Sequence, residues 1–198
     1  IPRKMPKDIL KNKNLLIGFD PKLFTKKSLN VFFGKRCKFR PLANNLIDKI
    51  WKRKIKKLNH SFYKLPDNCV GESYKTKLKK IAFFLKKHNA DFQLITASEN
   101  SAWLLNIRGN DADYTPIPYC YILISKNKNI KFFCDLKKIP FSFKKHFNNL
   151  EFVDKDKLDK TLSKISGKKF IIDRSTCSFY YENIINKKNK LLNLEDPI

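Results

Sequence analysis

Two aspartates and an arginine lie close together in the sequence and are the side chains best suited to chemistry. Asp111 and Asp113 are separated by one residue, and Arg108 lies three residues before Asp111. Two carboxylates in one loop can hold a hard cation through oxygen ligands or contact a substrate. They can also stabilise the loop, because aspartate accepts hydrogen bonds from nearby backbone amides and arginine can clamp a carboxylate. The pattern favours this second interpretation, a scaffold.

Other patterns typical of enzymes are missing from the sequence. Four residues that could act as nucleophiles have no histidine near them in the chain: Ser98, Ser101, Ser175 and Cys177. The histidines are far apart, at His60, His88 and His146. The cysteines form no Cys-x-x-Cys pair and stand at Cys37, Cys69, Cys120, Cys134 and Cys177. We therefore expect reduced, buried thiols, and no catalytic residue, metal site or cofactor in this chain.

The loop with the two aspartates is expected to follow a strand and a helix. Residues 92–95 predict a buried strand, and the apolar side chains after it recur at helical spacing: Ala102, Trp103, Leu105 and Ile107. Ser98 or Asn100 can cap the helix. Arg108-Gly109 should end it, because glycine adopts the left-handed backbone at no steric cost. The residues after this helix are expected to form a rigid polar loop, Asn110–Thr115.

A shorter pattern of strands and helices precedes this region. Residues 15–19 predict a buried strand, and Asp20 and Pro21 suit the first positions of a helix that should stop at Gly34. A short strand is expected at 36–39, and Asn44-Asn45 should begin a second helix. The apolar face of that second helix consists of Leu46, Ile47, Ile50 and Trp51.

Helices and strands also alternate in the rest of the chain. Ser73 can cap a long helix whose apolar positions are Tyr74, Leu78, Ile81, Ala82 and Leu85. Residues 119–124 and 130–134 predict a hairpin. Later patterns predict helices at 140–149, 158–165 and 179–185 and strands at 152–153 and 170–172. The fold class is therefore α/β, with a mixed β-sheet flanked by helices.

The chain is strongly basic, with a net charge of +25 over 198 residues. Lysines outnumber arginines by 37 to 6 and are spread along the chain. Base recognition and stacking favour arginine, so we do not expect nucleic acid as a functional partner beyond weak, salt-sensitive binding. No apolar run approaches the roughly 20 residues of a membrane helix, and the amino terminus lacks a signal-peptide pattern. A cytoplasmic protein without membrane attachment is expected.

Several blocks of the sequence resemble one family. The central block consists of Thr96-Ala97, Ala102-Trp103-Leu104-Leu105-Asn106-Ile107-Arg108-Gly109, Asp111 and Pro116. Further blocks are Gly18-Phe19-Asp20-Pro21, Asn45-Leu46-Ile47-Asp48-Lys49-Ile50-Trp51 and Gly71-Glu72-Ser73. Together they look like the amino-terminal domains of aminopeptidase P, the Xaa-Pro aminopeptidases with creatinase-like architecture. The central block is similar to the second of these domains.

The resemblance implies a domain plan. Residues 1–51 correspond to the carboxy-terminal remnant of the first creatinase-like domain, 52–66 to a basic linker, and 67–198 to the second creatinase-like amino-terminal domain. A catalytic domain of pita-bread fold, which holds two manganese or other divalent ions, is expected to follow Ile198. Intact enzymes of the family remove an amino-terminal residue that precedes proline. The resemblance therefore implies that this chain is a non-catalytic portion of such a metallopeptidase.

The same resemblance implies roles for the central block. Four residues are candidate contacts to the substrate cleft or the catalytic domain: Arg108, Asp111, Asp113 and Tyr114. Four others form the structural motif that supports them: Trp103, Asn106, Gly109 and Pro116. The implied partners are the chain's own catalytic domain, a peptide with proline in second position, and a second copy in a homodimer. The alternative is a stand-alone basic α/β module that binds nucleic acid or an acidic protein.

Overall fold

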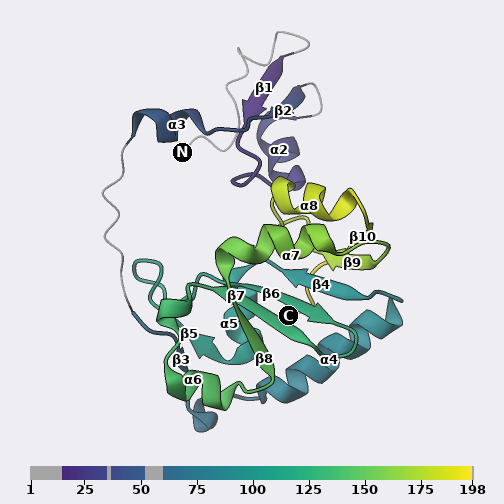
Figure 1. The fold of residues 1–198 in the computed structure, drawn as a ribbon. Coiled ribbons are helices and arrows are strands. Elements are labelled where there is room, and N and C mark those ends of the chain that lie inside the picture. Colours follow the sequence, from purple (N-terminus) through teal and green to yellow (C-terminus); the bar gives the residue numbers. More distant parts are fainter. Residues whose placement is uncertain (1–14, 35–36, 52–59, 198) are drawn as a thin grey trace. The chain divides into compact units, whose positions relative to one another are not determined.

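The computed structural model describes residues 15–34, 37–51 and 60–197. The expected lead-in at 1–13 and the basic residues 52–59 of the expected linker lie outside these ranges. The described part of the chain divides into two compact units (elements in Figure 1). Unit 1 comprises the described residues of Ile1–Lys56 and Arg174–Asn183, and unit 2 those of Lys57–Asp173 and Ile184–Ile198. The domain boundaries at 51, 66 and 198 stay a prediction.

The sheet of unit 2 has six strands within the described residues, in the order β10-β9-β4-β6-β7-β8. Their bounds are β4 (Phe92–Ile95), β6 (Tyr121–Ser125), β7 (Ile130–Cys134), β8 (Leu150–Asp154), β9 (Lys169–Ile172) and β10 (Lys190–Asn193). Strand β6 is antiparallel to β4 and β7, whereas the other neighbours are parallel. The mixed sheet and the β6–β7 hairpin that the sequence predicts are therefore confirmed.

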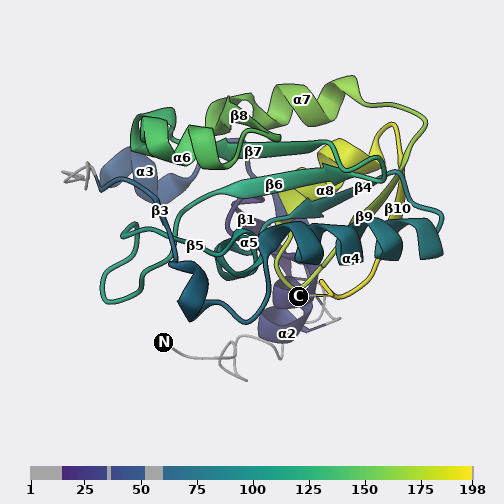
Figure 2. The ribbon, with the colours of Figure 1, turned by 90° about the horizontal axis from the view of Figure 1, so that it is seen from below.

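Helices cover both faces of this sheet. Helices α4 (Tyr74–Lys87) and α7 (Leu158–Lys164) lie on opposite faces (Figure 2). The other helices of unit 2 are α5 (Ser98–Leu105) and α6 (Phe141–His146), with short 3-10 turns η1 (Asp67–Cys69), η2 (Leu136–Lys138) and η3 (Lys155–Lys157). No helix in the described ranges is long and apolar enough to cross a membrane.

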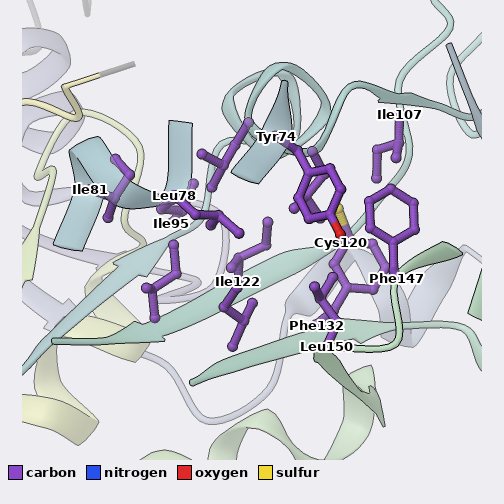
Figure 3. Close-up of a cluster of buried hydrophobic side chains, with 14 of the residues drawn as sticks. Tyr74, Leu78, Ile81, Ile95, Ile107, Cys120, Ile122, Phe132, Phe147 and Leu150 are labelled. Carbon is purple, nitrogen blue, oxygen red and sulfur yellow. The ribbon is translucent and has the colours of Figure 1, made fainter. Parts of the chain in front are cut away.

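Helix α4 forms as its sequence pattern predicts. The Ser73 hydroxyl oxygen accepts a hydrogen bond from the Thr76 backbone N–H at 3.2 Å, which caps the helix. The apolar face then packs on the sheet in one core cluster (Figure 3), which includes Leu78, Ile81, Leu85, Ile95, Ile122 and Phe132. Burying each such side chain contributes about 1.5–3 kcal/mol. This face fixes α4 against the strands, and α4 in turn supports α5.

Unit 1 is built around a parallel pair of strands, β1 (Leu16–Phe19) and β2 (Lys38–Pro41). Its helix α2 (Lys26–Phe33) begins later than Pro21, because Thr25 and Ser28 form a reciprocal capping box. The predicted start at Asp20 is therefore wrong. The Asp20 carboxylate accepts instead from the backbone N–H of Lys22 at 2.8 Å. The helix ends at Gly34, as predicted, with a φ of 75°.

The segment Arg174–Asn183, which includes the start of α8 (Phe179–Asn186), is part of unit 1. Glu182 is fully buried there, and its Oε1 accepts from Lys26 Nζ at 2.8 Å and from Arg174 Nε at 2.9 Å. The Phe179 ring meets Phe19 edge-on, with centroids 5.1 Å apart. A late segment of the chain therefore completes the core of unit 1, which no local sequence pattern indicates.

The short helix α3 (Leu46–Ile50) begins at the Asn45 cap, as predicted. Its apolar side chains are exposed, by 58% at Leu46, 55% at Ile47, 83% at Ile50 and 59% at Trp51. The sequence pattern therefore gives the helix but not its burial. A helix of this length buries a face only where another element is placed against it.

Candidate functional site, the loop between β5 and β6

Helix α5 delivers the chain to the loop, and it begins without a side-chain cap. Ala97 occupies the N-cap position, so the prediction that Ser98 or Asn100 caps the helix is wrong. The Asn100 amide donates instead to Asp196 Oδ2 at 2.7 Å. Gln93 donates to the other oxygen of Asp196 at 2.9 Å, and burial raises the pKa of Asp196. These two hydrogen bonds connect β4 and the start of α5 to Asp196, close to the end of the described chain.

Helix α5 ends at Leu105, four residues before Gly109. Asn106 is the C-cap and adopts the left-handed conformation, with φ 55° and ψ 42°. Asparagine tolerates this conformation because its short amide can bond to nearby backbone groups. Its Nδ2 donates to the Glu72 carbonyl at 2.9 Å, and its own carbonyl accepts from the Leu65 N–H at 2.8 Å. Asn106 therefore supports the end of α5, and Gly109 does not.

A buried lysine completes this cap. Lys77 is 5% exposed, and its Nζ donates to Asn106 Oδ1 at 2.6 Å and to the Trp103 carbonyl at 2.7 Å. The same ammonium lies 3.7 Å from the centroid of the Trp103 ring. Burial lowers the pKa of Lys77, and the nearby Glu72 carboxylate opposes that shift. Trp103 and Asn106, predicted as supporting residues, thus meet at a lysine that sequence reasoning did not single out.

Strand β5 (Ile107–Arg108) follows and pairs antiparallel with β3 (Tyr63–Lys64). Gly109 comes next, without a left-handed φ. A Cβ atom built there would lie 2.9 Å from Pro118 Cα and 3.0 Å from the Phe62 ring. The predicted helix-ending role of Gly109 is therefore wrong, and the glycine is required by close packing.

Asp111 anchors the loop. Its side chain is 2% exposed and forms an ion pair with Lys138, whose side chain is 17% exposed. The other carboxylate oxygen accepts from the Tyr119 backbone N–H at 2.8 Å. The carbonyl of Lys138 accepts from the Phe62 N–H at 2.8 Å, so the lysine is itself fixed. The geometry at Asp111 agrees with the scaffold interpretation.

The tip of the loop has the opposite character. Asp113 is exposed, and Tyr114 has a fully exposed side chain and a φ of 59°. The turn is closed by a hydrogen bond of 3.3 Å from the Thr115 N–H to the Ala112 carbonyl. A hollow of about 420 Å³ lies beside it, lined by Asp113, Tyr114, Pro116 and His60 among others. The tip therefore presents a carboxylate and a phenol to the outside.

Arg108 does not pair with either loop aspartate in the described part of the chain. Arg108 is half-buried, and its Nη1 donates to the Ile107 carbonyl at 2.8 Å. The structure thus separates the three residues that the sequence groups together: Asp111 is buried with Lys138, Asp113 is at the tip, and Arg108 lies on β5. Lys138 follows Asp111 by 27 residues. No sequence pattern links it to the loop.

The metal ions implied by the resemblance have no matching donors here. Among residues 15–34, 37–51 and 60–197, no three side chains of histidine, cysteine, aspartate or glutamate gather as a metal site. Asp111 uses both oxygens within the protein. The described residues therefore do not fit two divalent ions.

Unit 2 is thus a mixed-sheet α/β domain with an anchored loop whose tip is exposed. A family model described as "Creatinase/Prolidase N-terminal domain" matches residues 53–198. The chain belongs to this family.

Similar proteins of known name are Xaa-Pro aminopeptidases. The chain is 28% identical over 139 residues to Xaa-Pro aminopeptidase ApepP of Drosophila melanogaster, covering 68% of this chain and 22% of that protein. It is 30% identical over 140 residues to Xaa-Pro aminopeptidase 1 of Dictyostelium discoideum, covering 65% and 22%. The chain therefore spans about a fifth of the length of these curated relatives.

A solved structure shares the fold. The X-prolyl aminopeptidase from Caenorhabditis elegans matches with a TM-score of 0.79 and 21% identity, over 94% of this chain and 33% of that one. That protein is described as a cytosolic enzyme with a di-nuclear active site. The creatinase-type fold predicted from the sequence is confirmed.

Proposed function

We propose that this chain is the non-catalytic amino-terminal portion of a Xaa-Pro aminopeptidase, a metallopeptidase that removes an amino-terminal residue preceding proline. The observation that carries the proposal is the family match over residues 53–198. The names of the similar proteins agree with it. These matches give no support to a stand-alone module that binds nucleic acid or an acidic protein, and we do not retain that alternative.

We assign the loop tip to a contact with the substrate cleft of the catalytic domain. The support is physical. Tyr114 has a left-handed backbone conformation, which costs a non-glycine residue about 1–2 kcal/mol. Its side chain is nevertheless fully exposed, so no burial offsets this cost. Such strain at an exposed position is typical of contact sites that a rigid scaffold imposes. Arg108 is half-buried on the strand that enters the loop, and it is the second candidate contact.

The rest of the proposal concerns parts outside this chain. As the resemblance implies, the two manganese or other divalent ions are assigned to a catalytic domain that follows this chain. The partners are that domain and a peptide with proline in second position. A homodimer and a cytoplasmic location complete the proposal, and the cytosolic enzyme from Caenorhabditis elegans supports the location.

Two experiments test the proposal: sequencing of the transcript beyond residue 198, and a peptide-cleavage assay of the protein that it encodes. Sequence downstream of residue 198 should encode the spaced Asp, Asp, His, Glu and Glu ligands of the family's catalytic domain. The longer protein should cleave an Arg-Pro-Pro peptide and lose that activity with a chelator, whereas the 198-residue chain should show no turnover. A transcript that encodes only these 198 residues, or turnover by them alone, overturns the proposal.

A further inference from the structure

A hollow in unit 2, separate from the loop, gathers basic side chains. Its volume is about 670 Å³. It forms where the turns before β9 and β10 meet the residues that follow α4. Its lysines are Lys168, Lys169, Lys187, Lys188 and Lys190. We call it the lysine hollow.

Two of these lysines have structural partners. Lys169 Nζ donates to the His88 carbonyl, at the end of α4, at 2.9 Å. Lys188 Nζ lies 3.4 Å from the Ser163 carbonyl, in the last turn of α7. A cation is favourable at a helix carboxyl terminus, where unpaired carbonyls carry partial negative charge. Helix capping therefore accounts for Lys169 and Lys188.

The other three lysines form no salt bridge among the described residues: Lys168, Lys187 and Lys190. The acidic residue in the lining is Asp91, and it is already occupied. Its Oδ1 accepts from Lys126 Nζ at 2.8 Å, and its Oδ2 accepts from the Lys169 backbone N–H at 3.0 Å. Both hydrogen bonds lower the pKa of Asp91, and the one from Lys126 has the larger effect. The charge of Lys168 also lowers the pKa of Asp91, so this one carboxylate faces several cations and the hollow keeps a net positive charge.

The strand register brings like charges together. Lys190 on β10 is the direct neighbour of Lys169 on β9 in the parallel pair. Like charges on adjacent strands destabilise a sheet, and a bound anion relieves that repulsion. The fold thus gathers net positive charge in a shallow, open hollow of about 670 Å³.

We propose that the lysine hollow binds a small anion with several phosphate groups, for which inorganic tripolyphosphate is the probe. Ammonium groups recognise phosphate as point charges with several donors each. No residue in the described lining is aromatic, so the hollow lacks the stacking surface with which proteins hold single-stranded nucleic acid. The proposal is independent of the peptidase assignment.

The test is calorimetric titration of the 198-residue chain with sodium tripolyphosphate at constant ionic strength. We expect saturable binding to the unchanged chain. The triple variant Lys168→Gln, Lys187→Gln and Lys190→Gln should bind on the order of tenfold more weakly, because three charge-assisted contacts are lost. The control triple Lys155→Gln, Lys157→Gln and Lys160→Gln removes the same charge from exposed lysines elsewhere and should bind as the unchanged chain does.

Three results would overturn the proposal. The unchanged chain could show no saturable binding of tripolyphosphate, or the triple variant of the lysine hollow could bind it as tightly as the unchanged chain does. The third is that the hollow triple and the control triple weaken binding by the same factor. Tighter binding of a single-stranded oligonucleotide with as many phosphates would assign the surface to nucleic acid instead. The three lysines are exposed, so the triple should fold, which circular dichroism checks. Should it misfold, Lys187→Glu alone must weaken binding.

Discussion

The two ends of one loop differ in burial, in pairing with other residues and in backbone strain. At the anchor, Asp111 is buried, paired with Lys138 and bonded to backbone. At the tip, two residues later, Asp113 is exposed and Tyr114 is strained and exposed. A short Asp-x-Asp pattern therefore need not be one site. One aspartate holds the loop, and the other is displayed by it.

The largest expected effect is on stability at the anchor. Asp111→Ala should lower the free energy of unfolding by about 3–5 kcal/mol, because it leaves a mostly buried lysine without its counter-charge. The matched variant Asp113→Ala should stay within about 0.5 kcal/mol of the unchanged chain, since its side chain is exposed. Urea unfolding of both variants checks this, and equal losses would erase the distinction between anchor and tip.

A smaller loss is expected from the glycine beside the anchor. Gly109→Ala should cost about 1–3 kcal/mol, because the new methyl group meets the backbone of Pro118 and the Phe62 ring. The control is Gly71→Ala, where a Cβ meets nothing within 4 Å, and it should change stability by less than about 1 kcal/mol. Thermal unfolding of the two variants measures the difference. If Gly109→Ala is neutral, close packing is not the reason for this glycine.

The smallest expected effect lies at the tip and has the opposite sign. Tyr114→Gly should raise stability by up to about 1 kcal/mol, because relief of the left-handed backbone exceeds the entropy that glycine adds to the unfolded chain. Thr115→Gly, next to it, has no such strain to relieve and should lower stability by about 0.4–1 kcal/mol. Equal losses in both variants would show that the tip is not strained.

Periodicity predicted much of unit 2. The apolar spacing from Tyr74 to Leu85 and the cap at Ser73 gave α4, and the same kind of reasoning gave the β6–β7 hairpin. In α3 a similar spacing gave a helix whose apolar face stays exposed. The pattern predicts which side chains share one face of a helix. Whether that face is buried depends on whether another element packs against it in the tertiary structure.

The loop was predicted in outline, and its contacts were not. Left-handed caps are usually glycine, so the sequence assigns the helix end to Gly109, whereas Asn106, a predicted motif residue, takes that role. Lys77 stood among several exposed lysines on the same helix, with no local sign that it is buried. Lys138 is distant in sequence from Asp111. Such pairs depend on the tertiary fold, which a single sequence does not reveal.

We propose that the loop tip contacts the substrate cleft of a Xaa-Pro aminopeptidase. The most direct measurement is kcat/KM for a peptide with proline in second position, in the longer protein that carries Asp113→Ala and Tyr114→Ala together. We expect a loss on the order of tenfold with an unchanged melting temperature, since one lost charged contact costs about 1.5–3 kcal/mol. Asp156→Ala, which removes an exposed aspartate elsewhere, should leave kcat/KM unchanged. Unchanged kinetics in the double variant would contradict the claim.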